Sequence, residues 1–147
     1  MRAPFQILVI PFRRMAAGPE FAILKRSDTD YWQFVAGGGE DDETPEQAAQ
    51  RETKEETSLV STLTSLDSFS TVPRSYFAAA DSWSPDILVI PQHCFAIDAG
   101  GRDIELSREH TEFRWVQFEE ASRLLKWDSN RNALWELNER LKVSKTV

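Results

Sequence analysis

The sequence predicts an α/β (α+β) domain in which helices cover both faces of a mixed β-sheet. Apolar, β-branched and aromatic runs typical of buried strands are mixed with helical segments, without the regular strand–helix alternation of a parallel sheet. The 147 residues contain no internal repeat, low-complexity tract or linker, and 41% of them are hydrophobic, which is enough for one core. We therefore expect a single domain over residues 1–147.

Local composition predicts each element in turn. Strands are expected at residues 5–12, 20–26, 31–36, 60–66, 87–97 and 112–116, with 67–77 as a further strand or a continuation of 60–66. The first two strands are expected to be antiparallel, and Pro91 suggests a bulge or a sheet edge. Connections are expected at residues 13–19, 27–30, 37–39, 78–86 and, as a hairpin turn, 98–103. Helices are expected at residues 45–57, 118–125 and from 128 or 129 to about 143.

The best-defined element is the helix from Pro45 to about Thr57. Thr44 is the expected N-cap, Pro45 fits the first helical position, and Gln47 completes a capping box. Acidic side chains at positions 41–43 and 46 place negative charge at the positive end of the helix dipole. The start of this helix is therefore specified by its own neighbours in sequence.

Three glutamates share one face of this helix. Glu52, Glu55 and Glu56 are spaced i, i+3 and i+4, so their side chains fall within an arc of about 100°. Like charges at this spacing repel, and Mg²⁺, Ca²⁺ or Mn²⁺ would remove the repulsion by binding carboxylate oxygens. Such a triplet alone also fits a solvated acidic helix face. Arg51 beside it and the glycines at 37–39 before it favour a site for a metal ion and a phosphate chain.

Charge and composition limit the partners of the chain. The formal net charge of −7 argues against a nucleic-acid backbone or an anionic membrane surface as the main partner. A small phosphorylated substrate remains compatible with it, because a bound divalent metal reverses the local sign of the charge. The single cysteine, Cys94, lies in an apolar run and is expected to be a buried structural thiol. No run approaches the ~18 apolar residues of a membrane span, so we expect a cytoplasmic protein.

Residues 37–59 resemble the signature of the Nudix hydrolases, G-x5-E-x7-R-E-U-x-E-E-x-G-U, in which U is a bulky aliphatic residue. The positions in register are Gly37, Glu43, Arg51, Glu52, Glu55, Glu56 and Leu59. Two positions depart from the pattern, since Thr53 replaces an aliphatic residue and Ser58 replaces a glycine. The second departure leaves the form of the helix exit open.

The resemblance implies an α/β/α sandwich with a loop–helix–loop catalytic motif, and divalent-metal-dependent hydrolysis of a nucleoside diphosphate linked to another group. It implies that Glu52, Glu55 and Glu56 bind metal, and that one glutamate of this helix also helps to deprotonate the attacking water. Arg51 and Glu43 are expected to pair and to hold the motif rigid. The expected catalytic residues are therefore Glu43, Arg51, Glu52 and Glu55. Among them we expect loss of Glu55 to be the most damaging. Mg²⁺ is the expected cofactor, with Mn²⁺ as an alternative.

The chain also resembles a narrower subgroup, the dihydroneopterin triphosphate pyrophosphatases. The resembling segments are ILVIPF, LKRSDTDYWQFVAGG, the pair Glu109–His110 before FRWV, and KWDSNRNAL. This resemblance implies that the substrate is dihydroneopterin triphosphate or a (d)NTP and that the products are pyrophosphate and a monophosphate. Two other functions remain open, a dinucleoside polyphosphate or nucleotide-sugar hydrolase and a non-catalytic nucleotide-binding module. The oligomeric state, monomer or homodimer, also stays open.

Residues outside the motif are expected to complete the site. Glu109 and Glu112 are candidates for a further metal ligand, and His110 is expected to be a base or a hydrogen-bonded structural histidine. The candidate substrate-binding residues are Gly37, Gly38, Arg26, Trp32, Arg74, Asn130 and Arg131. Each side chain among them also has a structural explanation, such as a surface arginine or a core tryptophan.

Overall fold

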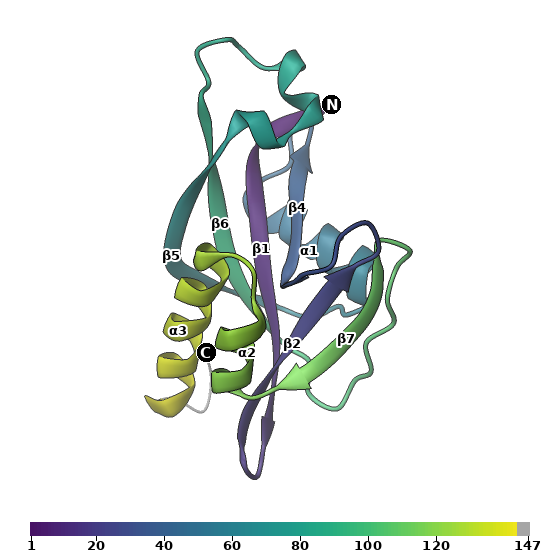
Figure 1. Cartoon of the computed structure of the whole chain (residues 1–147), viewed down its shortest axis with the longest axis vertical. Coiled ribbons are helices and arrows are strands. Elements are labelled where there is room, and N and C mark those ends of the chain that lie inside the picture. The colour runs from purple at the N-terminus through teal and green to yellow at the C-terminus, as the bar shows by residue number, and fades with distance from the viewer. Residues whose placement is uncertain (144–147) are drawn as a thin grey trace.

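A mixed seven-stranded sheet forms the centre of the computed structural model, which describes residues 1–143 (Figure 1). The strands are β1 (Arg2–Met15), β2 (Gly18–Arg26), β3 (Trp32–Gln33), β4 (Val35–Glu40), β5 (Leu63–Pro73), β6 (Val89–Asp98) and β7 (His110–Val116). The helices are α1 (Pro45–Thr57), α2 (Phe118–Leu124) and α3 (Asp128–Val143), and two 3₁₀ helices, η1 (Arg74–Tyr76) and η2 (Ala78–Ser82), follow β5. None of the helices within residues 1–143 is long and apolar enough to cross a membrane.

β1 is the central strand of this sheet. The order is β3-β2-β1-β6-β5, with β4 also paired to β1 and β7 also paired to β2. β1 runs antiparallel to β2, as predicted, and parallel to β6, so the sheet is mixed. A long strand that pairs with three others fixes the relative position of segments that are far apart in sequence.

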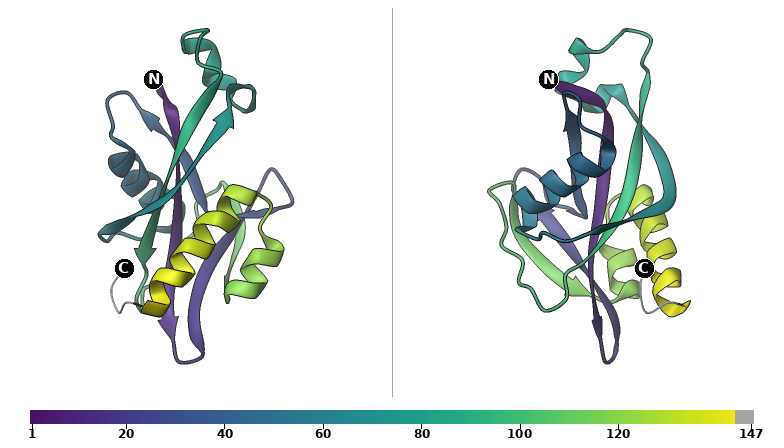
Figure 2. Two further views of the ribbon diagram at one scale, coloured as in Figure 1. Left: turned by 90° about the vertical axis from the view of Figure 1, so that its left-hand side faces the viewer. Right: turned by 180° about the vertical axis from the view of Figure 1, so that it is seen from behind.

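Alternating side chains of β1 supply the two apolar layers. Leu8 and Ile10 pack under α2 and α3 on one face, whereas Ile7 and Val9 pack under α1 on the other. Figure 2 shows α1 on one side of the sheet and α2 with α3 on the opposite side. The predicted fold class, helices on both faces of a mixed sheet, is confirmed.

The structure corrects several predicted boundaries. The glycines at 37–39 do not form a loop but continue β4, where they pair with β1. Residues 67–77 continue β5 only to Pro73 and then form η1, and the predicted loop 78–86 begins with η2. Residues 98–103 do not close a hairpin, because the next strand, β7, pairs with β2 and not with β6. These errors share one cause, since strand pairing depends on distant residues.

α1 has the bounds that the sequence predicts. The backbone conformation at its C-terminal end explains why the signature usually has glycine at the position of Ser58. Ser58 adopts a left-handed conformation with φ of 66°, and its N–H donates to the Lys54 carbonyl at 2.9 Å. Glycine adopts this conformation without the steric cost that a Cβ brings. Ser58 keeps the same helix exit, and its hydroxyl donates to the Glu105 carbonyl at 3.3 Å.

A bulge interrupts β5 and is held by α3. The register between β5 and β6 shifts between Ser65 and Phe69. The Glu136 carboxylate of α3 accepts from the N–H groups of Asp67 and Ser68, both at 2.7 Å. These bonds lower the pKa of Glu136 against the effect of its burial. The bulge is therefore a fixed part of the fold.

Candidate active site

The start of α1 is fixed by the predicted capping box. The N–H of Gln47 donates to the Thr44 hydroxyl at 3.2 Å, and the N–H of Thr44 donates to the Gln47 side chain at 2.9 Å. Ala48 and Ala49 are fully buried against the sheet, and their small size lets the helix axis approach it closely. α1 is therefore held both along its axis and toward β4.

Arg51 joins α1 to the loop before it and to β4. Its guanidinium donates to both carboxylate oxygens of Glu43, at 2.8 and 2.9 Å, and to the Gly38 carbonyl at 2.9 Å. It also donates to Glu52 at 3.0 Å and to Glu55 at 3.4 Å. The Arg51 guanidinium lowers the pKa of the Glu43 carboxyl, and Glu43 in turn raises the pKa of Arg51. The expected Arg51–Glu43 pair is present and keeps both groups charged.

Glycine at position 37 lets a glutamate lie directly over the strand. A Cβ at Gly37 would overlap with the Glu52 carboxyl group, and one at Gly38 would overlap with the Arg2 guanidinium on the other face of β4. The requirement at these positions is therefore close approach of charged side chains to the backbone, and not a turn. This contact brings the carboxylate of α1 against the strand that carries the Gly38 carbonyl.

The three glutamates of α1 lie in different environments. The Glu55 side chain is 57% exposed, that of Glu52 is 15% exposed and that of Glu56 is only 2% exposed. Burial raises the pKa of Glu52, although Arg51 opposes this. Burial also raises the pKa of Glu56 to about 10, and the charges of Glu52 and Glu109 add to the effect. Along the acidic face, the carboxyl groups therefore range from solvated, at Glu55, to fully desolvated, at Glu56.

The segment before β7 brings two distant residues to Glu56. The N–H of Glu105 donates to the Thr57 carbonyl at 3.0 Å, and that of Ser107 donates to the Glu56 carbonyl at 3.3 Å. The Glu109 carbonyl accepts from the N–H of Ser27 at 2.8 Å. These bonds join the chain before β7 to the end of α1 and to the end of β2.

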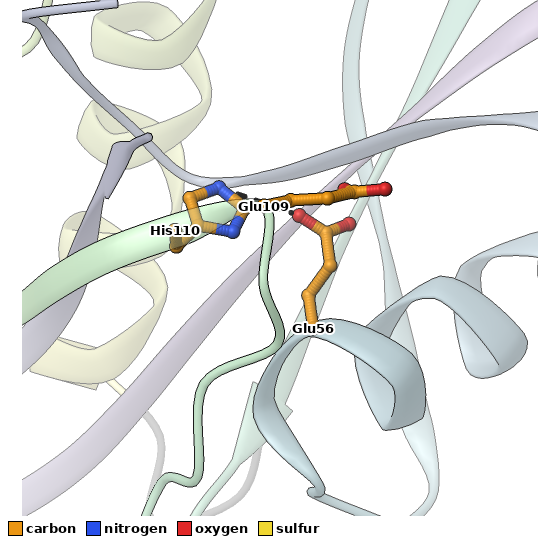
Figure 3. A group of neighbouring side chains, drawn as sticks. All are labelled: Glu56, Glu109 and His110. Atoms are coloured by element: carbon orange, nitrogen blue, oxygen red, sulfur yellow. Dashed lines mark ion pairs between the residues drawn. The ribbon is translucent and has the colours of Figure 1, made fainter. Parts of the chain in front are cut away.

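Glu56, Glu109 and His110 form one cluster as a result. One potential ligand atom from each residue lies within 4.8 Å of the other two. Figure 3 shows the Glu56 carboxylate, which rises from α1, pointing toward His110 and Glu109. Neither oxygen of Glu56 and neither ring nitrogen of His110 has a hydrogen-bond partner among the described residues. Buried polar atoms normally have partners, so this cluster fits residues that hold a cation.

The acidic face opens onto a pocket of about 770 Å³. Its lining residues are Glu40, Asp41, Asp42, Glu43, Gln47, Arg51, Glu52 and Glu55. Arg51 is the one cation among them, and its charge is shared with Glu43. A polyphosphate would be repelled by these carboxylates unless divalent cations were bound between them.

Comparison with known proteins identifies the family. The NUDIX domain matches residues 7–136, which include the whole motif from Gly37 to Leu59. The chain belongs to the Nudix family. Dihydroneopterin triphosphate diphosphatase of Escherichia coli K12 is 29% identical to this Nudix chain over 137 residues, which cover 90% of this chain and 91% of the relative.

Two solved structures show the same fold over nearly the whole chain. A Nudix hydrolase from Listeria monocytogenes has a TM-score of 0.87 and 48% identity, and covers 95% of each chain. The E. coli dihydroneopterin triphosphate pyrophosphohydrolase has a TM-score of 0.77 and 27% identity, and covers 95% of this chain and 97% of that chain. The chain is thus a Nudix pyrophosphohydrolase by its family and by its relatives.

The structure distinguishes Glu109 from Glu112, the two candidates for a further metal ligand. Glu109 joins the cluster at Glu56, whereas Glu112 lies 3.7 Å from Lys25 and 3.9 Å from Arg114. Arg26 lies opposite His110 in the β2–β7 register, near the cluster, and donates to both oxygens of Asp28 at 2.7 and 2.9 Å. Glu109 is therefore the better-placed ligand, and Arg26 is already engaged by Asp28.

Four predicted substrate-binding residues make contacts that explain them structurally. Trp32 is 7% exposed, with Lys25 and Arg114 over its ring, and Asn130 is 3% exposed and accepts from the Phe34 N–H at 3.0 Å. The remaining two are arginines bound to backbone carbonyls: Arg74 donates to Ala80, Ser84 and Ile87, and Arg131 donates to Leu125. These contacts stabilise connections around the sheet. None of the four residues belongs to the cluster of Glu56, Glu109 and His110.

Sequence reasoning missed the contribution of two residues. His110 is predicted as a base or a structural histidine and not as a potential metal ligand, whereas the structure places its ring in the cluster with Glu56 and Glu109. Arg2 carries the N-terminal end of β1 over Gly38 and lies against the rings of Phe77 and Trp83. No local pattern marks Arg2, because its neighbours come from three other parts of the chain.

We predict that Gly37→Ala lowers the rate of hydrolysis about 100-fold, because the new methyl group displaces the Glu52 carboxyl and misplacement of a catalytic group by about 1 Å has effects of this size. Steady-state kinetics with Mg²⁺ would measure the change. Gly101→Ala is the matched control, since a Cβ there meets nothing within 4 Å. Equal rates for the two variants would contradict the proposed role of the Gly37–Glu52 contact.

We also predict that Glu56 makes the metal-free protein less stable as the pH rises. The native carboxyl, with a pKa of about 10, keeps a proton that the unfolded chain releases near pH 4.5. The contribution of Glu56 to the free energy of unfolding is therefore fully present below pH 4.5. It is lost as the pH rises from 4.5 toward 10, by at most about 1.4 kcal/mol per pH unit. Denaturant unfolding in EDTA from pH 5 to 8 would show this fall in wild type and a flatter profile in Glu56→Gln. Parallel profiles would rule out the expected effect.

Proposed function

We propose that this Nudix protein is a divalent-metal-dependent pyrophosphohydrolase of nucleoside-triphosphate-like substrates, either dihydroneopterin triphosphate or a (d)NTP. The reaction breaks one phosphoanhydride bond, consumes one water and releases pyrophosphate and a monophosphate. The observation that carries the proposal is the set of buried, unpartnered oxygens of Glu56 beside Glu109, on the helix whose Glu52 and Glu55 line an acidic pocket. The name of the E. coli relative supports the choice of substrate.

The residues present fit Mg²⁺ or Mn²⁺, which prefer carboxylate oxygens. Glu56 and Glu109, whose carboxylate oxygens lie in one cluster, would hold the metal together with Glu52, which lies one turn before Glu56 on the same face of α1. A bound ion would supply charge neutralisation for the phosphates and a lower pKa for an attacking water. The Gly38 carbonyl is already used by Arg51, so the backbone at Gly38 acts mainly to hold α1 in place.

Glu55 is proposed as the group that accepts the proton of the attacking water. It is the most exposed carboxylate of the three, and the Arg51 guanidinium, 3.4 Å from its Oε2, orients it. Arg51 and Glu43 position the helix and do not need to touch the substrate. The water oxygen forms the new bond to phosphorus, the anhydride oxygen leaves with pyrophosphate, and the proton passes from Glu55 to solvent.

A hydrolysis screen tests the substrate class. Dihydroneopterin triphosphate, the common and oxidised (d)NTPs, diadenosine polyphosphates and ADP-ribose would be incubated with the protein and Mg²⁺ or Mn²⁺, and products separated. Pyrophosphate with a monophosphate supports the proposal. Two nucleotides from a dinucleoside polyphosphate would support the alternative of a dinucleoside polyphosphate or nucleotide-sugar hydrolase. Tight binding without turnover would support a non-catalytic module.

We predict that Glu55→Gln lowers kcat by about 10²- to 10⁴-fold with a smaller change in KM, because it removes the base while leaving the buried carboxylates in place. Pyrophosphate release at saturating Mg²⁺ would measure this. Glu46→Gln, which changes an exposed acid of the same helix outside the pocket lining, is expected to keep wild-type kinetics. Near wild-type turnover of Glu55→Gln would remove Glu55 from this role.

A further inference from the structure

His110 supplies a nitrogen atom to a cluster whose other members are carboxylates. Its side chain is fully buried, and its Nε2 lies 3.5 Å from Oε1 of Glu56. Neither ring nitrogen has a hydrogen-bond partner among residues 1–143. Buried imidazoles normally donate or accept at least one hydrogen bond, so the ring requires an explanation beyond packing.

The spacing of the donor atoms fits an ion between them. Two ligand atoms at right angles around an ion, each about 2.1 Å from it, are about 3.0 Å apart, and ligands on opposite sides are about 4.2 Å apart. The Glu56–His110 distance of 3.5 Å is close to the first value, and the 4.8 Å limit that encloses all three donors is slightly above the second. Small side-chain rotations would bring Glu56, Glu109 and His110 onto one ion.

The ligand atoms of Glu56, Glu109 and His110 differ in chemistry from the carboxylates that line the acidic pocket. Carboxylates alone suit Mg²⁺, whereas imidazole favours transition metals such as Co²⁺ or Zn²⁺, and affinity for N/O sites rises from Mn²⁺ to Co²⁺. Mg²⁺ also retains water in preference to binding nitrogen. One imidazole in the set therefore changes which ion is held most tightly.

We propose that His110 is a direct nitrogen ligand of a divalent metal held with Glu56 and Glu109, and that it makes this site select transition metals such as Mn²⁺ and Co²⁺ over Mg²⁺. This inference rests on the metal dependence of the proposed function and specifies one ion of that site. The competing arrangement is a histidine that only donates a hydrogen bond to a metal-bound Glu56. That arrangement leaves no bond between nitrogen and metal.

Pulsed electron paramagnetic resonance with Mn²⁺ as the probe distinguishes the two arrangements. The chain has two histidines, His93 and His110, so labelling with histidine that carries ¹⁵N in the ring changes only these imidazoles. We expect imidazole nitrogen coupling to bound Mn²⁺ that shifts from ¹⁴N to ¹⁵N on labelling. His93→Gln is the matched control and should keep the coupling, because His93 lies between the rings of Phe5 and Phe69. His110→Gln should lose it.

Affinity provides the second readout. Calorimetric titration should show that His110→Gln weakens binding of Mn²⁺ and Co²⁺ about tenfold or more, and binding of Mg²⁺ by less. Circular dichroism would establish that the variant is folded, and the labelling experiment on the wild-type chain needs no variant.

The outcomes separate this inference from the proposed function. Bound Mn²⁺ without directly bound imidazole nitrogen overturns the role of His110 and leaves metal-dependent hydrolysis intact. Equal loss of affinity for Mg²⁺ and Mn²⁺ in His110→Gln overturns the selectivity. Failure of the wild-type protein to bind Mn²⁺ or Mg²⁺ at all overturns both this inference and the proposed metal dependence.

Discussion

The guanidinium of Arg51 connects three parts of the motif between Gly37 and Leu59. It binds Glu43 in the preceding loop, the Gly38 carbonyl in β4 and two glutamates of its own helix. The bidentate pair with Glu43 is planar and charge-assisted, so it fixes orientation as well as distance. Lysine would provide one point of charge and would not span these acceptors. The positions of Glu43, Glu52 and Glu55 therefore depend on this one side chain.

The same helix carries a group that opposes folding. Glu56 is buried without a hydrogen-bond partner among the described residues, and a group in that state is costly to keep in its charged form. Ala48 and Ala49, earlier in α1, offset this by packing on the sheet. The geometry that suits a cation is thus maintained by apolar contacts, by Arg51 and by the capping box. Binding of a cation by Glu56 would then offset the cost of keeping this buried carboxylate charged.

Features that depend on neighbouring residues could be predicted from the sequence. The capping box of Thr44, the bounds of α1 and the shared face of the glutamates belong to this group. The sequence offered Glu109 and Glu112 equally as further ligands, and it could not decide between them or place His110 beside Glu56, because that approach depends on backbone bonds such as that from Ser107 to Glu56. Asn130 shows the same limit, since a polar residue at a helix start suits a ligand as well as the N–H of Phe34. Local patterns specify elements, and pairing between distant strands decides which side chains meet.

The bulge in β5 has a consequence for how molecules of this protein meet one another. β5 is an edge strand, and edge strands offer backbone groups on which a second chain can add a strand. Glu136 takes up the N–H groups of Asp67 and Ser68 in the middle of that edge, and the shift in register bends it. An 11-residue strand is thereby broken into two shorter stretches. The contact between α3 and β5 therefore also protects the chain against aggregation by edge-to-edge strand pairing.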